Sequence, residues 1–254
     1  MKDRPRIAVL GKGNVGSHLA KALEGKADVT LISSRGDIDL PGDTDVCLIC
    51  VKDDAIAEVA SKLNGFRGVV AHTSGSVPMS ALEPAGCSHG VFYPLQTFSK
   101  GVALDYASIP IFIEASDERA QHALEGVADA MGAVWHPADS ARRRKLHLAS
   151  VFACNFTNRL YAIADKLLRE EGTGIGVLMP LIGETVRKLG ETLDPEASQT
   201  GPASRGDSEV VRRHLDMLSS NPQAAEIYRL LSADIYRASG HGELDFQTDN
   251  DIQK

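Results

Sequence analysis

The stretch RIAVLGKGNVG, residues 6–16, carries an apolar run into a helical pattern through three glycines spaced as GxGxxG. In a strand–turn–helix each of these glycines has its own task. Gly11 forms the tight turn, Gly13 lets the backbone approach a pyrophosphate, and Gly16 lets the helix pack closely on the strand. The start of the helix supplies free N–H groups and partial positive charge to the phosphates. A tight turn without a ligand is the alternative, but the position directly after an N-terminal strand favours a dinucleotide site.

The alternation of strand-like and helix-like segments continues to about Pro137. Five further apolar runs are typical of strands, namely DVTLISS, DVCLICV, GVVAHTS, GVFYPL and IPIFIE. The helical patterns include NVGSHLAKALEGK, DAIAEVASKL and DERAQHALEGVADAMG. Compact apolar strands separated by helices indicate a parallel sheet covered on both faces. We therefore predict an α/β fold whose N-terminal part is a doubly wound, mainly parallel sheet of Rossmann type.

From Asp139 onward only helical patterns remain. The segment from Ser140 to Gly172 is long enough for one helix of about 30 residues, and three further helical patterns follow it. We predict a nucleotide-binding domain over residues 1–138 and an all-α domain over residues 139–242. The polar residues 243–254 are predicted to form a disordered tail.

Composition excludes several classes of protein. The formal net charge of −7 argues against nucleic acid or an anionic membrane surface as the main partner. The N-terminus lacks the apolar stretch of a signal peptide, and the most apolar later segment is interrupted by polar residues, so we expect no membrane span. Cys47 and Cys50 form a CxxC inside a strand-like run, whereas redox CxxC pairs normally lie at exposed helix starts. We expect core thiols, no bound metal and a cytoplasmic protein.

The end of the second predicted strand, SSRG, bears on the choice of cofactor. NAD sites usually place Asp or Glu there to accept from the ribose 2′-hydroxyl. This chain has Ser33, Ser34 and Arg35 instead, which offer hydroxyls and a guanidinium to a 2′-phosphate. Arg35 as a solvated loop residue is the alternative. We predict NADP(H), held by residues in the first four strand-end loops: Gly11, Gly13, Asn14, Val15, Gly16, Ser33, Ser34, Arg35, Val51, Lys52 and Thr73.

Polar side chains also follow the next strands along the chain. Lys52 follows the third strand, Thr73 and Ser74 follow the fourth, and Gln96 follows the fifth. Open α/β sheets bind ligands outside the carboxyl ends of their strands, so we expect Ser74 and Gln96 to contact the substrate. Simpler roles remain open: Lys52 as a solvated side chain, and the hydroxyls after the fourth strand as helix caps.

A polar streak follows one face of the long predicted helix. At about 100° per residue, Asn155 and Asn158 lie about 80° and about 20° from His147, and Arg144 lies about 60° from it. Lys145 falls about 160° away. Buried histidine and asparagine need hydrogen-bond partners, which either a substrate or neighbouring helices supply. We predict His147 as the general acid, because histidine titrates near neutral pH, with Asn155 orienting the substrate and Asn158 contacting it.

The stretch QTGPASRGD, residues 199–207, interrupts the helical patterns with two glycines and a proline. Nothing in the sequence suggests export, so the RGD tripeptide is not interpreted as an adhesion site. Asp207 is a favoured residue for capping the helical pattern SEVVRRHLDML that follows. Arg205 suits bidentate binding of a substrate carboxylate. The stretch is either a turn alone or part of the substrate site, with Arg205 as anion clamp and Asp207 as cap or orienter.

The stretches GKGNVG, HTSGS, YPLQTF, LHLASVFACNFTN and TGPASRGD, in this order, resemble the Rossmann-like proteins whose C-terminal helical domain has no known function. That family is similar in turn to the pyrroline-5-carboxylate, ketopantoate and β-hydroxyacid reductases. The resemblance implies a helical domain like the C-terminal domain of 6-phosphogluconate dehydrogenase, which often forms a dimer contact. Several of these reductases use a lysine near the start of the long helix as general acid. Lys145 lies near that place, so Lys145 and His147 both remain candidates.

Two functions from different classes fit these patterns. We predict an NADP-dependent oxidoreductase that reduces a small, anionic 2-oxo or imino acid by hydride transfer, with ketopantoate-like acids among the candidates. A non-catalytic NADP-binding sensor or scaffold is the alternative, and it would have less need of a polar streak facing the nicotinamide. The expected partners are a small-molecule substrate and a second copy of the chain, bound through the helical domain.

Overall fold

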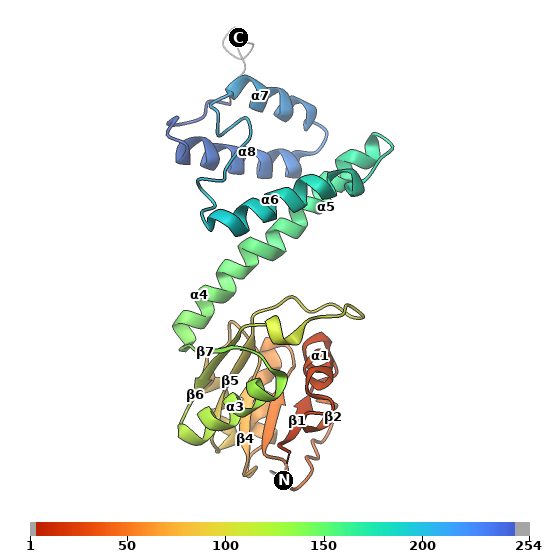
Figure 1. Ribbon diagram of the computed structural model, residues 1–254, viewed down its shortest axis with the longest axis vertical. Helices are drawn as coiled ribbons and strands as arrows, with labels where there is room; N and C mark the ends of the chain where they lie inside the picture. Colours follow the sequence, from red (N-terminus) through yellow and green to blue (C-terminus); the bar gives the residue numbers. More distant parts are fainter. Residues whose placement is uncertain (1–3, 247–254) are drawn as a thin grey trace. The chain divides into compact units, whose positions relative to one another are not determined.

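The computed structural model describes residues 4–246, which form two compact units, one ending at Thr157 and one beginning at Asn158 (Figure 1). The first unit is an α/β domain with the predicted sheet at its centre. Its seven strands have the order β2-β1-β3-β4-β5-β6-β7. The strands are β1 (Arg6–Leu10), β2 (Asp28–Ile32), β3 (Val46–Ile49), β4 (Val69–His72), β5 (His89–Pro94), β6 (Ile111–Ala115) and β7 (Trp135–Pro137).

The strand pairing places most carboxyl ends at one edge of the sheet. β1 pairs in parallel with β2 on one side and with β3 on the other, and β3, β4 and β5 continue in parallel. β6 runs antiparallel to β5 and parallel to β7. From β1 the strand order continues to β2 on one side and to β3 on the other. The point between β1 and β3, where the order reverses, is a topological switch point. The mainly parallel sheet is confirmed, whereas the three-residue strand β7 was too short to show in the sequence pattern.

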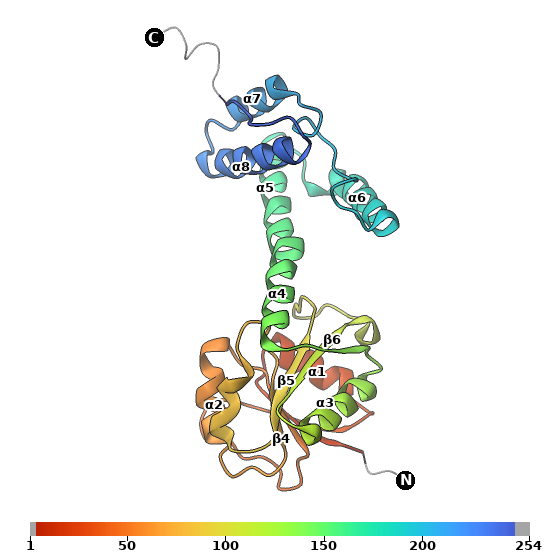
Figure 2. The same ribbon diagram turned by 90° about the vertical axis from the view of Figure 1, so that its left-hand side faces the viewer.

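Helices cover both faces of this sheet, as Figures 1 and 2 show. α1 and α3 lie on one face, where Leu19 and Leu124 pack with Val9 of β1. α2 and a 3₁₀ helix lie on the other face, where Val59 and Leu82 pack in a second core. The helices are α1 (Asn14–Leu23), α2 (Ile56–Lys62), the 3₁₀ helix η2 (Met79–Ala85) and α3 (Glu118–Met131).

Both ends of α3 have residues that favour a helix end at that position. Asp117 caps α3 by accepting a hydrogen bond from the Ala120 N–H at 2.8 Å, and Gly132 ends the helix in a left-handed conformation. The two cysteines of the CxxC are buried, free thiols. Burial raises the pKa of both Cys47 and Cys50 to about 12, so both are unreactive core thiols as predicted. Within residues 4–246, no helix has both the length and the apolar character needed to cross a membrane.

The long predicted helix is not a uniform α-helix. It consists of α4 (Ser140–Ser150), the π turn η4 (Val151–Phe156) and α5 (Thr157–Glu170). A π turn contains more residues per turn than an α-helix. The projection at about 100° per residue therefore does not hold beyond Ser150, and the predicted common face of His147, Asn155 and Asn158 has to be corrected.

A buried arginine joins the start of α4 to the sheet domain. The Arg143 side chain is 1% exposed and forms an ion pair with Glu114 of β6. Its guanidinium also donates to the Ser74 carbonyl at 3.1 Å and to the Val77 carbonyl. These bonds place α4 in the first compact unit, so the division between the units follows Thr157 rather than the predicted boundary between residues 138 and 139.

The second unit is helical. It contains α6 (Met179–Thr192), α7 (Ser208–Met217) and α8 (Pro222–Ala238) in addition to α5. Its core is formed around Ala203, Val211 and Leu244, with Phe246 packed against it. Arg237 pairs with Glu243 at 3.0 Å. Residues 243–246 therefore pack on the helices, which corrects the prediction that a disordered tail begins at residue 243; the rest of that predicted tail lies outside the described residues.

The Arg143 network leads to a prediction about stability. Arg143→Met removes the guanidinium and leaves Glu114 and two backbone carbonyls without their partner. We expect the free energy of unfolding to fall by about 3–5 kcal/mol, measured by denaturant unfolding. Arg144→Met changes the neighbouring, exposed arginine in the same way and should change stability by less than about 0.5 kcal/mol. Equal effects of the two substitutions would contradict the anchoring role.

Candidate functional site

The glycine-rich turn lies at the switch point between β1 and β3. Gly11 has φ +121° and its backbone packs so closely on Cys50 that a Cβ would overlap the Cys50 carbonyl. A Cβ on Gly16 would overlap the Gly11 carbonyl, so this glycine allows α1 to approach β1. A Cβ on Gly13 would meet no atom within 4 Å, and this position is exposed. Two glycines therefore build the turn, and the third leaves its surface accessible to a ligand.

The start of α1 adds hydrogen-bond donors to this turn. Ser17 N–H bonds to the Gly13 carbonyl at 2.9 Å, as the first bond of the helix. The N–H groups of Asn14, Val15 and Gly16 precede it and have no carbonyl one turn earlier within the helix. Gly13 provides no side-chain cap, and the first turn has no acidic residue. These donors and the open face of Gly13 fit a pyrophosphate, as the sequence predicts for a dinucleotide.

The other predicted cofactor residues lie in the adjoining strand-end loops. Gly11 N–H donates to the Ile32 carbonyl at 2.9 Å, which joins the glycine turn to the end of β2. Ser33 and Ser34 follow there and are half-buried, and the Arg35 side chain is exposed. Ser33 Oγ accepts from the Arg35 N–H at 3.2 Å. No carboxylate occupies these three positions at the end of β2.

The end of β3 borders the glycine turn on its other side. Val51 is half-buried, and its Cγ1 would lie 3.4 Å from a Cβ on Gly11. Lys52 is exposed. Thr73, in the loop after β4, donates through Oγ1 to the Ile49 carbonyl at 3.4 Å. The fold thus brings the end of β3 and Thr73 to the same edge of the sheet as the glycine turn.

The Ser74 hydroxyl organises the loop after β4. Ser74 Oγ accepts hydrogen bonds from the N–H groups of Ser76 and Val77, both at 3.1 Å. Ser76 Oγ in turn donates to Asp53. Ser74 therefore caps the turn, which is the simpler of the two roles that the sequence leaves open, and its role toward a substrate stays a prediction.

The next loop, between β5 and β6, is held against α1. Gln96 is exposed, and its Oε1 accepts from the Thr97 N–H at 2.8 Å. Asn14 Nδ2 donates to the Phe98 carbonyl at 3.0 Å, and His18 of α1 bonds to the Ser99 carbonyl at 3.0 Å. The Asn14 side chain thus supports the loop, while its backbone N–H belongs to the glycine turn. The loop that carries Gln96 is fixed to the helix that carries the glycine motif.

His147 lies against the loop after β4 and the end of β5. Its Nδ1 lies 3.2 Å from the Tyr93 hydroxyl, and the two rings meet edge to face with centroids 6.1 Å apart. Gly75 fills the space between them, since a Cβ there would lie 2.7 Å from His147 Nδ1 and 2.8 Å from Tyr93 Cζ. Three elements therefore position the His147 ring. Lys145, the other candidate acid, is exposed on the same helix.

The remaining predicted substrate residues lie beyond α4. Asn155 lies in the π turn and is exposed, whereas Asn158 belongs to the second unit. In that unit, Asp207 caps α7 by accepting from the Val210 N–H at 3.2 Å, which confirms its predicted capping role. Backbone hydrogen bonds close the loop around Arg205, including one from Asp207 N–H to the Pro202 carbonyl at 2.9 Å. The loop thus holds an exposed Arg205 on an ordered backbone.

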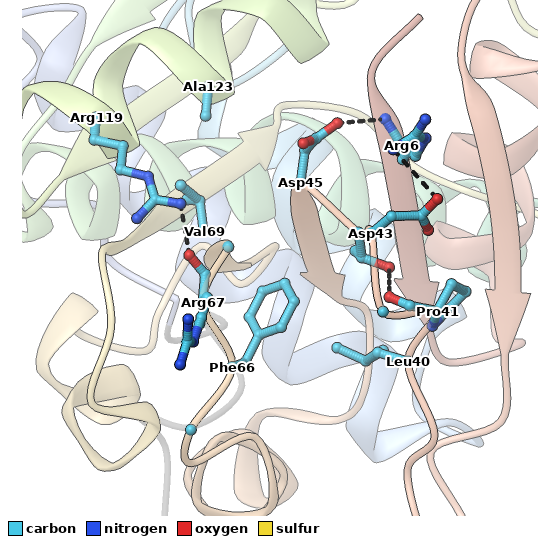
Figure 3. Close-up of a pocket in the computed structure, with 14 residues that line it drawn as sticks. Arg6, Leu40, Pro41, Asp43, Asp45, Phe66, Arg67, Val69, Arg119 and Ala123 are labelled. Atoms are coloured by element: carbon cyan, nitrogen blue, oxygen red, sulfur yellow. Dashed lines mark hydrogen bonds and ion pairs between the residues drawn. The ribbon is translucent and has the colours of Figure 1, made fainter.

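A hollow of about 750 Å³ lies at the other end of the strands, where β1 and β4 begin (Figure 3). Its charged side chains face each other: Arg6 pairs with Asp43 at 3.2 Å and bonds Asp45 through its N–H at 2.9 Å. Arg119 donates to the Arg67 carbonyl at 2.5 Å. None of the predicted site residues lines this hollow, which is therefore separate from the glycine turn.

Residues 109–235 match the model of a family described as a domain of unknown function (DUF2520). The chain belongs to this family. None of the curated proteins matches the chain.

Solved structures resemble the chain over nearly its whole length. A proposed NADP oxidoreductase from Bacteroides fragilis is 36% identical, with a TM-score of 0.85 and coverage of 92% of this chain and 98% of that one. A pyrroline carboxylate reductase from Plasmodium falciparum with NADP bound is 12% identical (TM-score 0.59, coverage 94% and 98%). A reductive aminase from Aspergillus terreus with NADPH and ethyl levulinate is 14% identical (TM-score 0.64, coverage 99% and 100%). At 12% and 14% identity, the similarities to the Plasmodium and Aspergillus proteins show only that the fold is shared.

The sequence did not reveal some of the residues around His147. Tyr93 lies in a quoted motif, but its contact with His147 joins residues 54 positions apart, and no spacing rule indicates such a pair. Arg143 lies within a run of basic residues that resembles a solvated face. The burial of Arg143 can be inferred only when the strand that carries its partner Glu114 is known to lie beside it.

His72, at the end of β4, is fully buried beside this network. Its Nδ1 accepts from the Ser74 N–H at 3.2 Å, while its Nε2 has no hydrogen-bond partner among the described residues. Burial, and then the positive charge of Arg143, lowers the pKa of His72 from 6.5 to about 4. His72 therefore remains neutral in the folded protein at neutral and mildly acidic pH.

The depressed pKa of His72 leads to a prediction about pH. Between pH 6.5 and about 4 the unfolded chain binds a proton that folded His72 does not, so stability falls as the pH falls through this range. Between pH 7 and 5 this effect amounts to about 2 kcal/mol. His72→Asn keeps an acceptor for the Ser74 N–H but does not titrate. From pH 7 to pH 5, the free energy of unfolding should fall by about 2 kcal/mol less in the variant than in the parent protein, measured by denaturant unfolding. An equal fall in both proteins would contradict the prediction.

Proposed function

We propose that this protein is an NADP(H)-dependent oxidoreductase that reduces the carbonyl or imine group of a small, anionic acid. The observation that carries the proposal is the glycine turn, in which Gly11 and Gly16 tolerate no Cβ and the N–H groups at the start of α1 lie beside an open Gly13. This arrangement is the dinucleotide-binding form of a strand–turn–helix. The similar protein from Bacteroides fragilis, itself a proposed NADP oxidoreductase, supports the same conclusion.

NADP(H) is proposed as the cofactor because of the residues at the end of β2. Ser33, Ser34 and Arg35 offer two hydroxyls and a guanidinium where an NAD site usually has a carboxylate. A guanidinium binds a 2′-phosphate through charge-assisted hydrogen bonds. The NADP and NADPH bound to the Plasmodium and Aspergillus proteins of similar fold agree with this choice.

His147 is proposed as the group that provides the proton. NADPH bound at the glycine turn would supply the hydride for the carbon of the C=O or C=N bond, and a side chain of the protein would supply the proton for the oxygen or nitrogen. His147 is held by Tyr93 and Gly75 in the sheet domain, at the carboxyl edge where the strand-end loops lie. Asn155 and Asn158 are proposed to orient the substrate through their amides, and Ser74 and Gln96 to contact it.

Arg205 is proposed to bind the carboxylate of the substrate. Its guanidinium is exposed, and the backbone around it is fixed by hydrogen bonds and by the capping residue Asp207. An ordered loop loses less conformational entropy on binding than a mobile one, so a guanidinium presented in this way is suited to hold an anion. The proposed substrate class of 2-oxo or imino acids depends on this residue.

The proposal predicts a defined pattern of cofactor binding and turnover. NADPH should bind more tightly than NADH by about tenfold or more, and Arg35→Ala should remove most of this preference. NADPH absorbance should then fall when the protein is incubated with one or more members of a panel of 2-oxo acids, including ketopantoate, with and without amines. Tight NADPH binding without oxidation across the panel would favour a sensor or scaffold. Equal binding of NADH, unaffected by Arg35→Ala, would contradict the choice of cofactor.

With an active substrate in hand, substitutions separate the proposed roles. His147→Gln should lower kcat by about 10²–10⁴-fold, because the proton donor is lost. Lys145→Met, on an exposed position of the same helix, tests the alternative acid, and a larger loss in this variant would reverse the assignment. Arg205→Ala should raise KM for the acid without changing the affinity for NADPH. An unchanged KM would indicate that residues 199–207 form a turn and do not bind the substrate.

We further propose that a second copy of the chain covers the helical unit. Neither α5 nor α6 has a buried residue as the structure describes them, although both have a strong apolar face. Exposed apolar side chains on these helices are Leu160, Leu167, Met179, Leu181, Val186 and Leu189. An apolar area of this kind on a water-soluble protein usually marks an interface. Sedimentation equilibrium should give twice the chain mass, and the mass of one chain at micromolar concentration would contradict the proposal.

A further inference from the structure

The last described residues, 240–246, form a segment that folds back on the helical unit, and we call it the C-terminal segment. Gly240 follows α8 in a left-handed conformation, with φ +82°, which ends the helix. Arg237 of α8 then donates to both carboxylate oxygens of Glu243, each at 3.0 Å. Leu244 is buried in the core of the unit. These contacts hold the C-terminal segment in one place on the helices.

His241, in this segment, bonds the turn that carries Arg205. Its Nε2 lies 3.0 Å from the Ser204 carbonyl oxygen. A carbonyl oxygen can only accept, so Nε2 carries a proton and donates it. The His241 ring also lies against Gly206, because a Cβ on Gly206 would come within 3.0 Å of Cε1 and Nδ1 of the ring. His241 therefore contacts both the residue before Arg205 and the residue after it.

The His241 ring is itself fixed by α8. Its centroid lies 5.0 Å from that of the Tyr236 ring, and the two planes are tilted by 46°. The backbone N–H of His241 donates to the Tyr236 carbonyl at 3.2 Å. Tyr236 packs in turn against the core formed around Val211. A ring held in this way loses little further freedom when it bonds the turn, so the hydrogen bond is formed at a small cost in entropy.

The turn that carries Arg205 is closed by its own backbone. The N–H groups of Arg205 and Asp207 both donate to the Pro202 carbonyl, at 3.2 and 2.9 Å. These bonds join near neighbours in the sequence and determine the form of the turn. The bond from His241 joins residues 37 positions apart, and it attaches the turn to the segment that follows α8.

We infer that His241 is a positioning residue for Arg205, which holds the turn through its Nε2–H bond to Ser204 so that the guanidinium is presented to the carboxylate of the substrate. The inference rests on the proposed function, in which Arg205 binds that carboxylate. A guanidinium on a fixed backbone loses less conformational entropy on binding than one on a mobile backbone. Loss of the His241 bond should therefore weaken binding of the acid and leave the chemical step unchanged.

Limited digestion with trypsin tests the bond without any substrate. Trypsin cleaves after arginine, and cleavage between Arg205 and Gly206 requires the turn to open. His241→Ala removes one exposed hydrogen bond and should increase the rate of cleavage there by about three- to tenfold, measured by mass spectrometry of the fragments. Cleavage after Lys188, on α6 of the same unit, is the reference. An unchanged rate after Arg205, or an equal increase after Lys188, would overturn the inference.

Two further substitutions separate the hydrogen bond of His241 from the packing of its ring. His241→Gln keeps an Nε2 donor, so its rate of cleavage after Arg205 should stay within about twofold of that of the parent protein. His241→Phe keeps an aromatic ring without a donor and should behave like His241→Ala. A rate for His241→Phe equal to that of the parent protein would show that ring packing alone holds the turn, and it would overturn the inference.

The chain provides a matched control in the sheet domain. His122 of α3 is also an exposed histidine, and its Nδ1 bonds the Glu118 carbonyl at 2.7 Å. His122→Ala therefore removes the same kind of histidine–carbonyl bond at a distant position in the sequence. It should leave the rate of cleavage after Arg205 unchanged. An increase equal to that in His241→Ala would overturn the assignment.

Turnover separates the inference from the proposed function. On an active substrate, His241→Ala should raise KM for the acid by about three- to tenfold, with kcat and NADPH affinity changed by less than about twofold. His241→Gln should restore most of this loss. A turn that opens more readily in His241→Ala, with no turnover on any substrate, would remove the proposed function and leave the His241 bond intact. An unchanged KM in His241→Ala, where Arg205→Ala raises KM, would remove the positioning role alone.

Discussion

A guanidinium in an apolar interior is the constraint on which the described site depends. Arg143 is buried at the start of α4, and an unpaired charge there would be very costly. Glu114 forms an ion pair with the Arg143 guanidinium. The other N–H groups of the guanidinium donate to two carbonyls of the loop after β4 and to the Ser140 hydroxyl. A single side chain thereby fixes the antiparallel strand β6, the loop with Ser74 and Gly75, and the helix with His147. The position of the His147 ring follows from this arrangement.

Much of the fold could be predicted because its signals are local. The glycine motif, the apolar strands and the capping residues each depend on a few neighbouring positions, and the sheet, α1 and the cap by Asp207 agree with them. The sequence pattern failed where a distant contact or a subtle change of helix type decides the outcome. The residues of the π turn, Val151–Phe156, are of the kinds that also occur in α-helices, so the sequence does not distinguish the two. The 3.6-residue period assumed for the whole segment is therefore not maintained through this turn.

The candidate site shows the same contrast. The residues of the glycine turn lie where the motif predicts them, since each responds to steric demands of its immediate neighbours. The helical periodicity indicates His147, but the residues that position its ring come from β5 and from the loop after β4. Tyr93 and Arg143 act through contacts with residues far apart in sequence, and neither has a spacing that distinguishes it from an ordinary strand tyrosine or a solvated arginine. The sequence likewise predicts that Leu244 and Phe246 belong to a tail, whereas both pack in the core of the helical unit.

The loop between β5 and β6 is attached to α1 by Asn14 and His18, which bond the carbonyls of Phe98 and Ser99. β5 carries Tyr93 just before this loop, and α1 begins at the glycine turn. A small displacement of α1 along its axis would pull on the loop and, through it, on the strand that supports the imidazole. The glycine turn and the residues that hold the His147 ring are thus connected through one short loop, although they belong to strands that are not neighbours in the sheet.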